Sequence, residues 1–475
     1  MRQYCVVLFG LALVNAIGDS PRLPRSGGAA LSHLQGKCST IPDLCTYMSS
    51  FSQSFRDMSN QIKIQSDDIK KLQGMISDLQ SSFGDLAELT RRSVTSLSSQ
   101  ANIESTPDPE CAQKPPMRLS VNRNGFCLNG RKFHILGTVG PFATFPSFGN
   151  NAYRQSQETI QKWIKDIKQN GGNTISLLIG FNPSEIAKIL SQSTSKIQVY
   201  HQSILQDINT MLQDAAKEKV TVQLILFSSS VQGMEFFLEK DPVVLRFTDL
   251  ILSPIVQKLK GNPTISSWVI FNHPEDFLDL DEKSIKICTD PESMKRYSPM
   301  IYKTKTRTGL SVLQLQKVTN WIADSIHNAD ENALVTIQVL SLATITDSPR
   351  KFMTTNYFSN ACLKAAGNRQ NGYLDFYQSR EASNPDKSRW FSISPFLNKY
   401  EEYNFDKPVV IVTDPEVIVS GSRLDGLWVT LAQQGYSGTL GGSYRMANHK
   451  EKVNNAMQAL KKAVLERKLK VNVEN

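Results

Sequence analysis

The sequence has little that would support membrane insertion, a zinc site or a low-complexity architecture. No stretch after the first twenty residues approaches the roughly 18 to 20 consecutive apolar residues that a membrane helix needs. No CxxC pair or Cys/His cluster with zinc-finger spacing occurs, and there are only 6 histidines. Glycine (26) and proline (21) are near their average abundance, which excludes a collagen-like chain. We therefore expect a soluble protein without a metal or other cofactor.

Neither sign of charge is in large excess. Lys and Arg total 53 against 44 Asp and Glu, a net charge of +9 spread over 475 residues. Only the segment 461–470 is locally basic, which is typical of a solvated helix face. The pattern therefore predicts no nucleic-acid partner. The length exceeds one ordinary domain, so we expect the chain to be divided.

The first residues have the pattern of a secretory signal peptide. Arg2 supplies a positive charge, residues 6–14 are apolar, and Ala16 and Gly18 place small residues at the positions that select cleavage. The apolar run is too short to span a bilayer, and the alternative is a short buried helix. We expect residues 1–18 to be removed and the protein to be secreted, extracellular and without a membrane partner.

The cysteine count agrees with an oxidising compartment. Removal of the signal peptide takes Cys5 with it and leaves an even number, which predicts disulfides. Six cysteines allow fifteen pairings, and sequence alone does not choose among them. The disulfide candidates are Cys38, Cys45, Cys111, Cys127, Cys288 and Cys362.

A rod-like segment follows a cysteine-containing segment at 19–45. Between 46 and 100 apolar residues recur with alternating spacings of three and four, as in a coiled coil, and only Gln65 interrupts the d row. The a row holds Ile62, Ile69 and Ile76, and the d row holds Leu72, Leu79 and Leu86. This pattern favours a parallel homodimer. The alternative is a helix packed on its own domain. A proline-rich linker at 101–117 precedes a globular part at 118–475.

The globular part alternates helix and strand patterns after a hairpin signal at Asn129-Gly130. Alternation of this kind implies parallel strands, and eight strands close a barrel. We therefore predict an α/β fold, a (β/α)8 barrel, with its chemistry at the carboxyl ends of the strands. The strand candidates are 133–136, 173–179, 220–227, 265–271, 333–340, 374–377, 409–412 and 437–440.

Short stretches at these strands resemble the glycoside hydrolase family 5 barrels, most closely the invertebrate endo-β-1,4-mannanases. They lie in the same order, each on a predicted strand or the residues leading into it. They read FCLNGRKF (126–133), GGNT (171–174), NPTI (262–265), NHPE (272–275), LDFYQ (374–378), KPVVI (407–411) and GYSGTL (435–440).

The resemblance implies a retaining mechanism, which needs two carboxyl groups roughly 5 Å apart. The family's acid/base glutamate aligns with His273, between the retained Asn272 and Pro274, and its nucleophile aligns with Thr413. Neither residue performs the family's role. Other family positions are also replaced: the strand-two arginine beside the nucleophile, the histidine after strand six, a nearby aromatic residue and the tryptophan after strand eight. They align with Ser176, Arg380, Ala382 and Gly442.

These replacements predict a barrel that has lost catalysis and acts as a glycan-binding, extracellular matrix or structural protein. The alternative is an active endo-β-1,4-mannanase that uses displaced carboxylates. Because strand side chains alternate faces, an odd offset from Thr413 or His273 is expected to point away from the site. These acids otherwise act as solvated loop residues. The displaced candidates are Glu275, Asp276, Asp414 and Glu416.

Aromatic residues near the strand ends are candidates for stacking on sugars, although in a barrel of this size such residues more often belong to the core. They are Trp268, Tyr377, Trp428 and Tyr444.

Overall fold

The computed structural model describes most of the globular part of the chain. The described residues are 111, 118–123, 125–140, 152–228, 234–277, 310–348, 356–381, 394–416, 423–442, 447–466, 469 and 473. They belong to one compact unit that spans Thr106–Asn475. The predicted signal peptide, the segment 19–45 and the predicted coiled coil lie outside the described residues, as does most of the predicted linker.

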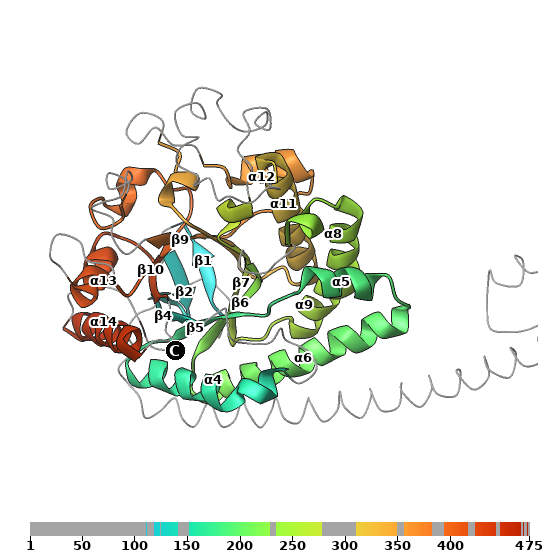
Figure 1. Cartoon of the computed structure of the whole chain (residues 1–475). Coiled ribbons are helices and arrows are strands. Elements are labelled where there is room, and N and C mark those ends of the chain that lie inside the picture. Colours follow the sequence, from blue (N-terminus) through green and yellow to red (C-terminus); the bar gives the residue numbers. More distant parts are fainter. Residues whose placement is uncertain are drawn as a thin grey trace, which may run out of the picture. The chain divides into compact units, whose positions relative to one another are not determined.

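Eight parallel strands close into a barrel, as the sequence predicts, in the order β10-β11-β4-β5-β6-β7-β8-β9 (Figure 1). Each strand is short and almost wholly buried, which matches the apolar runs that predicted it. The bounds are β4 (Ile135–Val139), β5 (Thr174–Leu178), β6 (Thr221–Ser228), β7 (Ile265–Asn272), β8 (Val335–Val339), β9 (Tyr377–Glu381), β10 (Val409–Thr413) and β11 (Gly438–Gly441).

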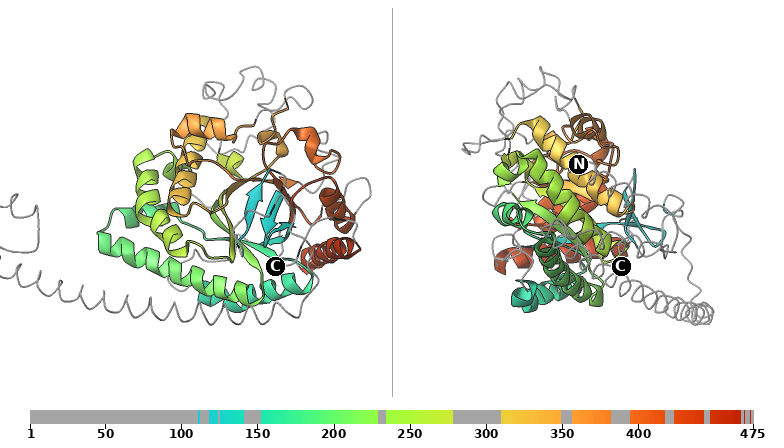
Figure 2. Two further views of the ribbon diagram at one scale, coloured as in Figure 1. Left: turned by 180° about the vertical axis from the view of Figure 1, so that it is seen from behind. Right: turned by 90° about the vertical axis from the view of Figure 1, so that its right-hand side faces the viewer.

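Helices surround the barrel on all sides (Figure 2). The α-helices are α4 (Ala152–Gln169), α5 (Pro183–Leu190), α6 (Thr194–Lys217), α7 (Met234–Leu238), α8 (Asp241–Phe247), α9 (Ser253–Leu259), α11 (Val312–Ala329), α12 (Asn360–Gly367), α13 (Leu424–Gln433) and α14 (Ala447–Leu465). A π-helical turn, η2 (Thr248–Leu252), joins α8 to α9, and 3-10 turns form η3 (Pro274–Phe277), η5 (Leu342–Thr344) and η8 (Tyr400–Tyr403). Within the described ranges, no helix has the length and apolar character needed to cross a membrane.

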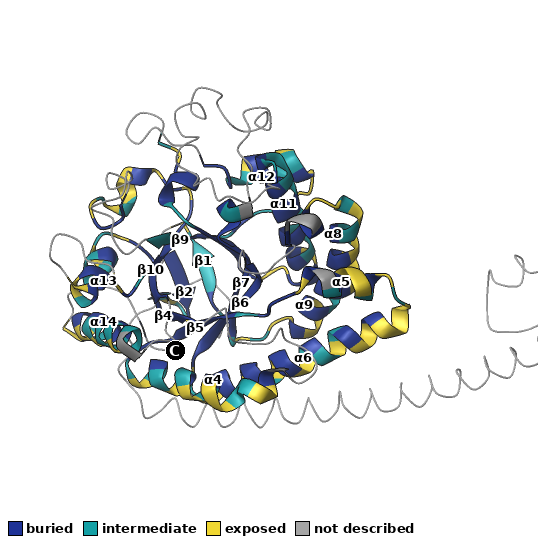
Figure 3. Cartoon of the chain, in the orientation of Figure 1, coloured by how far each residue is buried: buried dark blue, intermediate teal, exposed yellow. Residues whose placement is uncertain are grey.

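The strands separate two apolar cores. Along β10, Val409 and Ile411 belong to the cluster that includes the inward faces of the helices. Val410 and Val412 belong to a second cluster, with Ile225, Val269 and Leu440 of other strands, which is the barrel interior. This alternation, expected for strands, identifies which side of each strand faces the barrel axis. Figure 3 shows the outcome: the strands are buried, and the helices are exposed on their outer faces.

A small antiparallel sheet closes one end of the barrel. It consists of β1 (Ser120–Asn122), β2 (Gly125–Leu128) and β3 (Arg131–Phe133). Asn129 and Gly130 form the tight turn between β2 and β3 with φ of 52° and 73°, which confirms the hairpin. Phe126 packs edge-on against Phe376, at 4.9 Å between ring centroids, just before β9 begins. The sheet therefore covers the amino ends of the strands, which we call the base; the carboxyl ends are the mouth.

Three of the predicted disulfide candidates lie among the described residues. Cys111 is bonded to Cys127 of β2, with their Cα atoms 5.5 Å apart. Cys362 is buried on α12, a helix that packs against α11, and its predicted disulfide stays a prediction. Cys38, Cys45 and Cys288 lie outside the described residues.

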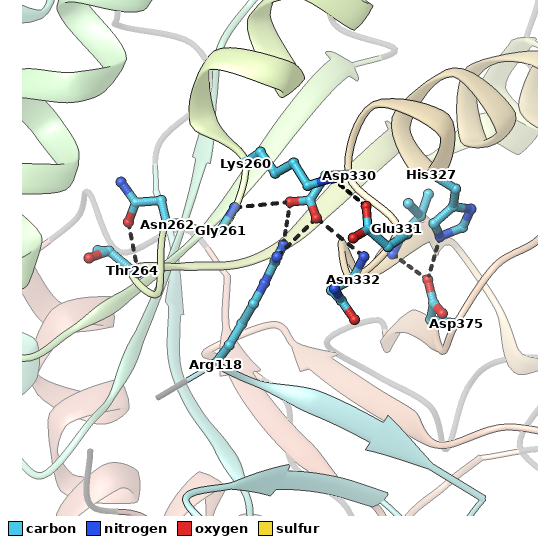
Figure 4. A network of polar contacts seen from close by, with 11 residues as sticks. Arg118, Lys260, Gly261, Asn262, Thr264, His327, Asp330, Glu331, Asn332 and Asp375 are labelled. Atoms are coloured by element: carbon cyan, nitrogen blue, oxygen red, sulfur yellow. Dashed lines mark hydrogen bonds and ion pairs between the residues drawn. The ribbon is translucent and has the colours of Figure 1, made fainter. Parts of the chain in front are cut away.

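Charged residues fasten the base (Figure 4). Arg118 donates two hydrogen bonds to Asp330, of 3.0 and 2.7 Å, and links the segment before β1 to the loop between α11 and β8. The same carboxylate accepts from the backbone amides of Gly261 and Asn332. His327 and the amide of Val335 share the Asp375 carboxylate in the same way.

Candidate functional site

A chain of polar side chains crosses the mouth. Asn272 ends β7, and its amide nitrogen lies 3.5 Å from Ser228 Oγ at the end of β6. Gln338 of β8 donates from Nε2 to Asn272 Oδ1 (2.6 Å) and lies 3.4 Å from His273 Nε2. The backbone amide of His273 donates to Gln338 O (2.8 Å). Three neighbouring strands thus hold one connected group of polar atoms at their carboxyl ends.

His273 is a buried, neutral hydrogen-bond acceptor. Two donors approach its Nε2, the Gln338 amide and Arg380 Nη1, each at 3.4 Å, so its proton belongs on Nδ1. Burial, and next the Arg380 charge, lower the pKa of His273 to about 3. Its φ of 58° lies in the left-handed region, which is uncommon for a residue other than glycine. Side chains around the mouth therefore fix both the charge and the tautomer of His273.

Arg380 continues the chain toward β10. It pairs in register with Val412, whose side chain faces the barrel interior, so Arg380 also faces inward. Its Nη2 lies 3.9 Å from Asp414 Oδ2. Asp414 Oδ1 accepts from the amide of Glu416 (3.0 Å), which orients the carboxylate. Asp414 does not point away from the site, because the expectation from its odd offset assumed that Thr413 faces the mouth.

Thr413 faces the opposite side of β10. Its hydroxyl accepts a hydrogen bond from Trp428 Nε1 of α13 (2.9 Å), and it is completely buried between barrel and helices. The residue that follows it, Asp414, therefore has the inward parity of Val410 and Val412.

Glu275 is a buried carboxyl group in η3, directly after β7. Its Oε1 accepts from the Leu340 amide (2.9 Å) and the Thr344 hydroxyl (3.0 Å), both beyond β8. Its Oε2 has no hydrogen-bond partner in the described part of the chain. Burial raises the pKa of Glu275 to about 7. A carboxyl group with this pKa is able to donate a proton near neutral pH.

The other two displaced candidates have different surroundings. Glu416 pairs with His449 (3.0 Å) and Lys452 (2.7 Å) of α14, and the Lys452 hydrogen bond is the main cause that lowers its pKa. Asp276 Oδ2 lies 3.9 Å from His273 Nδ1, on the nitrogen that carries the proton. Glu416 therefore anchors α14, whereas Asp276 faces His273.

The sequence interpretation missed Glu381. It ends β9 next to Arg380, and it pairs in register with Thr413, on the outward side. Burial raises the pKa of Glu381 well above its usual range, and Tyr403 of the outer core lies close to its charge. The predicted strand ended at 377, before Glu381 was reached. The polar residues 378–381, which continue the strand, were the signal in the sequence that could have extended the prediction to Glu381.

The remaining predicted positions fall into three groups. Ser176 faces the barrel interior from β5 and is completely buried. Gly442 follows β11, and its amide donates to Thr413 O (2.8 Å). Ala382 and Tyr444 lie outside the described residues. Three aromatic candidates are fully buried, so they belong to the core and do not present a face to a sugar: Trp268, Tyr377 and Trp428. Over the described ranges, no cluster of three or more His, Cys, Asp and Glu could hold a metal ion.

The chain is similar to two invertebrate proteins. It is 27% identical over 329 residues to the mannan endo-1,4-beta-mannosidase of Cryptopygus antarcticus, which covers 68% of this chain and 83% of the relative. It is 23% identical over 331 residues to the protein of the same name from Mytilus edulis, covering 68% and 86%. A scan against protein-family models found no match.

Solved structures show the same barrel. The beta-1,4-mannanase of the sea hare Aplysia kurodai superposes with a TM-score of 0.64 at 21% identity, over 75% of this chain and all of that protein. The mannanase of Cryptopygus antarcticus gives a TM-score of 0.61 at 24% identity, over 72% and 94%. These likenesses establish the fold of the described unit.

The prediction of lost catalysis is contradicted by these relatives, both of which are named as mannan endo-1,4-beta-mannosidases. The finding supports the alternative prediction, an active mannanase. The physical reason lies at the strand ends: replacement at His273 and Thr413 does not remove every carboxyl group, since Glu275 and Asp414 follow directly after β7 and β10. The chain is thus a homologue of the invertebrate mannan endo-1,4-β-mannosidases and has the barrel fold of the glycoside hydrolase family 5 mannanases.

Proposed function

We propose that the protein is an endo-acting hydrolase of β-1,4-mannan that uses carboxyl groups displaced from the usual family positions. The observation that carries this proposal is the similarity to two mannan endo-1,4-beta-mannosidases over more than four fifths of their lengths. The presence of two carboxyl groups directly after β7 and β10 supports it. Glycoside hydrolysis needs such a pair, one to protonate the leaving oxygen and one to act at the anomeric carbon.

Glu275 suits the part of general acid. Its pKa of about 7 keeps a substantial protonated fraction at neutral pH, and its Oε2 carries no hydrogen bond in the described part of the chain. The Leu340 amide and the Thr344 hydroxyl hold Oε1, which fixes the orientation of the carboxyl group.

Asp414 suits the part of the second carboxylate. The Glu416 amide orients Oδ1, and the Arg380 guanidinium lies 3.9 Å from Oδ2. The resemblance places the family's arginine at Ser176, where it would stand beside the nucleophile. Arg380 brings a guanidinium to the mouth from β9 instead. Asp414 then either attacks the anomeric carbon or activates a water, and the configuration of the first product distinguishes these two routes.

A reducing-sugar assay on linear β-1,4-mannan tests the proposal. We expect the purified full-length protein to release oligosaccharides of several lengths. Asp414→Asn should lower kcat by roughly 10²- to 10⁴-fold. Asp249→Asn is the matched control because Asp249 is exposed on η2, and it should leave kcat unchanged. No release of reducing ends by the unaltered protein, or equal rates for Asp414→Asn and the control, would contradict the proposal.

We also propose that the protein is secreted and forms a homo-oligomer through the heptad pattern of 46–100. The disulfide between Cys111 and Cys127 supports an oxidising compartment. Linked barrels would bind a polysaccharide more tightly than one barrel does, through effective concentration. Sedimentation of the full-length protein against residues 117–475 tests the assembly, and a full-length monomer at micromolar concentration would contradict it.

A further inference from the structure

We propose that Arg380 makes the mouth of the barrel a binding site for a carboxylate-bearing sugar, so that the preferred chain is a β-1,4-mannan backbone with acidic residues. Only the identity of the polysaccharide backbone, β-1,4-mannan, rests on the proposed function. The acidic preference comes from the geometry around the guanidinium.

The guanidinium stands within the mouth rather than on the outer surface. Arg380 belongs to an inward-facing row with Val412 and Leu440, which are paired in register across β9, β10 and β11. Its side chain is about one third exposed, 34% by relative area, so it is accessible to a ligand and partly shielded from water. A cation in such a position attracts an anion more strongly than one on an open surface does.

Within the described part of the chain, the groups that face Arg380 leave its guanidinium fork available. The contact with His273 is to a neutral acceptor at 3.4 Å. The carboxylate that faces Arg380, Asp414, lies 3.9 Å away, which is longer than a hydrogen bond. Guanidinium and carboxylate prefer two parallel hydrogen bonds of about 2.7–2.9 Å. An incoming carboxylate is able to form that pair.

The nearby acidic residues weaken the positive potential at Arg380 but leave its guanidinium able to bind a carboxylate. Asp414 is the direct competitor, but its Oδ1 is committed to the Glu416 amide. Asp276 lies against the opposite nitrogen of His273, 3.9 Å from Nδ1. Glu275 directs Oε1 to Leu340 and Thr344, and its raised pKa leaves part of it uncharged at neutral pH. The positive field also reaches His273, where the Arg380 charge lowers the pKa further.

Chemistry then identifies the ligand class. Neutral mannan offers hydroxyl groups, which hydrogen-bond to neutral amides as well as to a guanidinium. A C6 carboxylate offers a planar pair of acceptors that matches the arginine fork. Lysine or glutamine in place of arginine does not bind this pair in the same way. The structure therefore favours a uronate-containing chain over a wholly neutral one.

The experiment compares two short oligosaccharides with the same β-1,4-linked backbone, one of mannose and one of mannuronate. Binding to the full-length protein is measured by calorimetry at low and at high salt. We expect the acidic oligosaccharide to bind at least about tenfold more tightly at low salt, and the advantage to shrink at high salt. Arg380→Gln should remove the advantage, so that the acidic and the neutral oligosaccharide bind with similar affinity.

Three further variants make the outcome specific. Arg369→Gln is the matched control, because Arg369 is exposed in the loop before β9, at the base, and the same charge is lost. Arg380→Lys keeps the charge without the fork and should lose part of the advantage. Asp414→Asn removes the competing carboxylate and should tighten binding of the acidic oligosaccharide severalfold.

Equal affinity for both oligosaccharides, or an advantage that survives in Arg380→Gln, would overturn the inference. Hydrolysis is measured separately on neutral and acidic polymers. A protein that binds mannuronate through Arg380 but cleaves neither polymer would leave this site intact and refute the proposed hydrolase. A protein that cleaves neutral mannan but shows no preference for the acidic oligosaccharide would support the proposed hydrolase and refute the carboxylate-binding site.

Discussion

The two ends of the barrel hold their charged residues in different ways. At the base, Asp330 receives two hydrogen bonds from Arg118 and two more from backbone amides (Figure 4). At the mouth, Arg380 lies at 3.4 and 3.9 Å from its two neighbours, and Glu275 leaves one oxygen without a partner in the described ranges. Among the described residues, the base thus satisfies its charges internally, whereas at the mouth the partly exposed Arg380 keeps hydrogen-bonding capacity for a ligand, as in barrels that act at the carboxyl ends of their strands.

The largest effect that sharpens this comparison concerns Thr413. Thr413→Glu would restore the family's residue type at this position, but the side chain faces Trp428 in a fully buried layer. A carboxylate there loses its hydration, so we expect a loss of about 4 kcal/mol or more in the free energy of unfolding. Urea unfolding measures it. The control Thr413→Val removes only the hydrogen bond and should cost about 1–2 kcal/mol. A stable Thr413→Glu protein with faster turnover would show that Thr413 faces the mouth.

A smaller effect is expected from Glu275. Its pKa rises from 4.5 to about 7 on folding, so its contribution to stability is present below pH 4.5 and is lost as the pH rises through 7. The lost contribution is about 3 kcal/mol. Glu275→Gln keeps the acceptor for Leu340 but does not titrate. The variant should therefore lose less stability between pH 5 and pH 8. Denaturant midpoints at both pH values check this, with the exposed Glu401→Gln as control. Identical pH dependence in Glu275→Gln and unaltered protein would count against the raised pKa.

At the base, Asp330→Asn should weaken the fold and spare the mouth. The change leaves the Arg118 guanidinium facing a neutral amide in a site where Asp330 is 3% exposed, at a cost of about 2 kcal/mol. We expect a lower Tm and unchanged kcat well below that temperature. A lower kcat at temperatures well below the Tm would show that the two ends of the barrel are coupled.

The smallest effect concerns His327, also at the base. Burial lowers its pKa, but the hydrogen bond and charge of Asp375 outweigh this and raise the pKa of His327 overall. Its contribution is therefore complete below pH 6.5 and is lost as the pH rises through the folded-state pKa. His327→Gln should show a smaller drop in Tm from pH 6 to pH 9 than the unaltered protein. An equal drop in both would exclude His327 as the titrating group.

The fold could be predicted from the sequence because buried strands and amphipathic helices carry strong patterns. The predicted strand 409–412 and β10 (Val409–Thr413) differ by one residue. The first barrel strand was predicted at 133–136, but Phe133 ends the hairpin strand β3, and β4 begins at Ile135. The apolar spacing of residues 243–259 is that of a single helix, but the segment contains the π-turn η2, which precedes Pro254 and which apolar spacing does not reveal.

The site could be located from the sequence but not oriented. The resemblance indicated the ends of β7 and β10, and His273 and Asp414 are both found there. Which face Thr413 presents depends on its partner Trp428, fifteen residues later on α13. The contact between Arg380 and Asp414 likewise joins two strands that are distant in sequence. Spacing along the chain carries no information on such pairings.

The disulfide between Cys111 and Cys127 has a consequence for the unfolded chain. It closes a loop of 16 residues that includes β1 and the first residues of β2. A loop of this size restricts the denatured ensemble by about 3 kcal/mol of conformational entropy in the chain-entropy description. The strands that cover the base therefore begin the search for their native pairing already close together. Once that pairing forms, Phe126 of β2 is placed next to Phe376 at the start of β9.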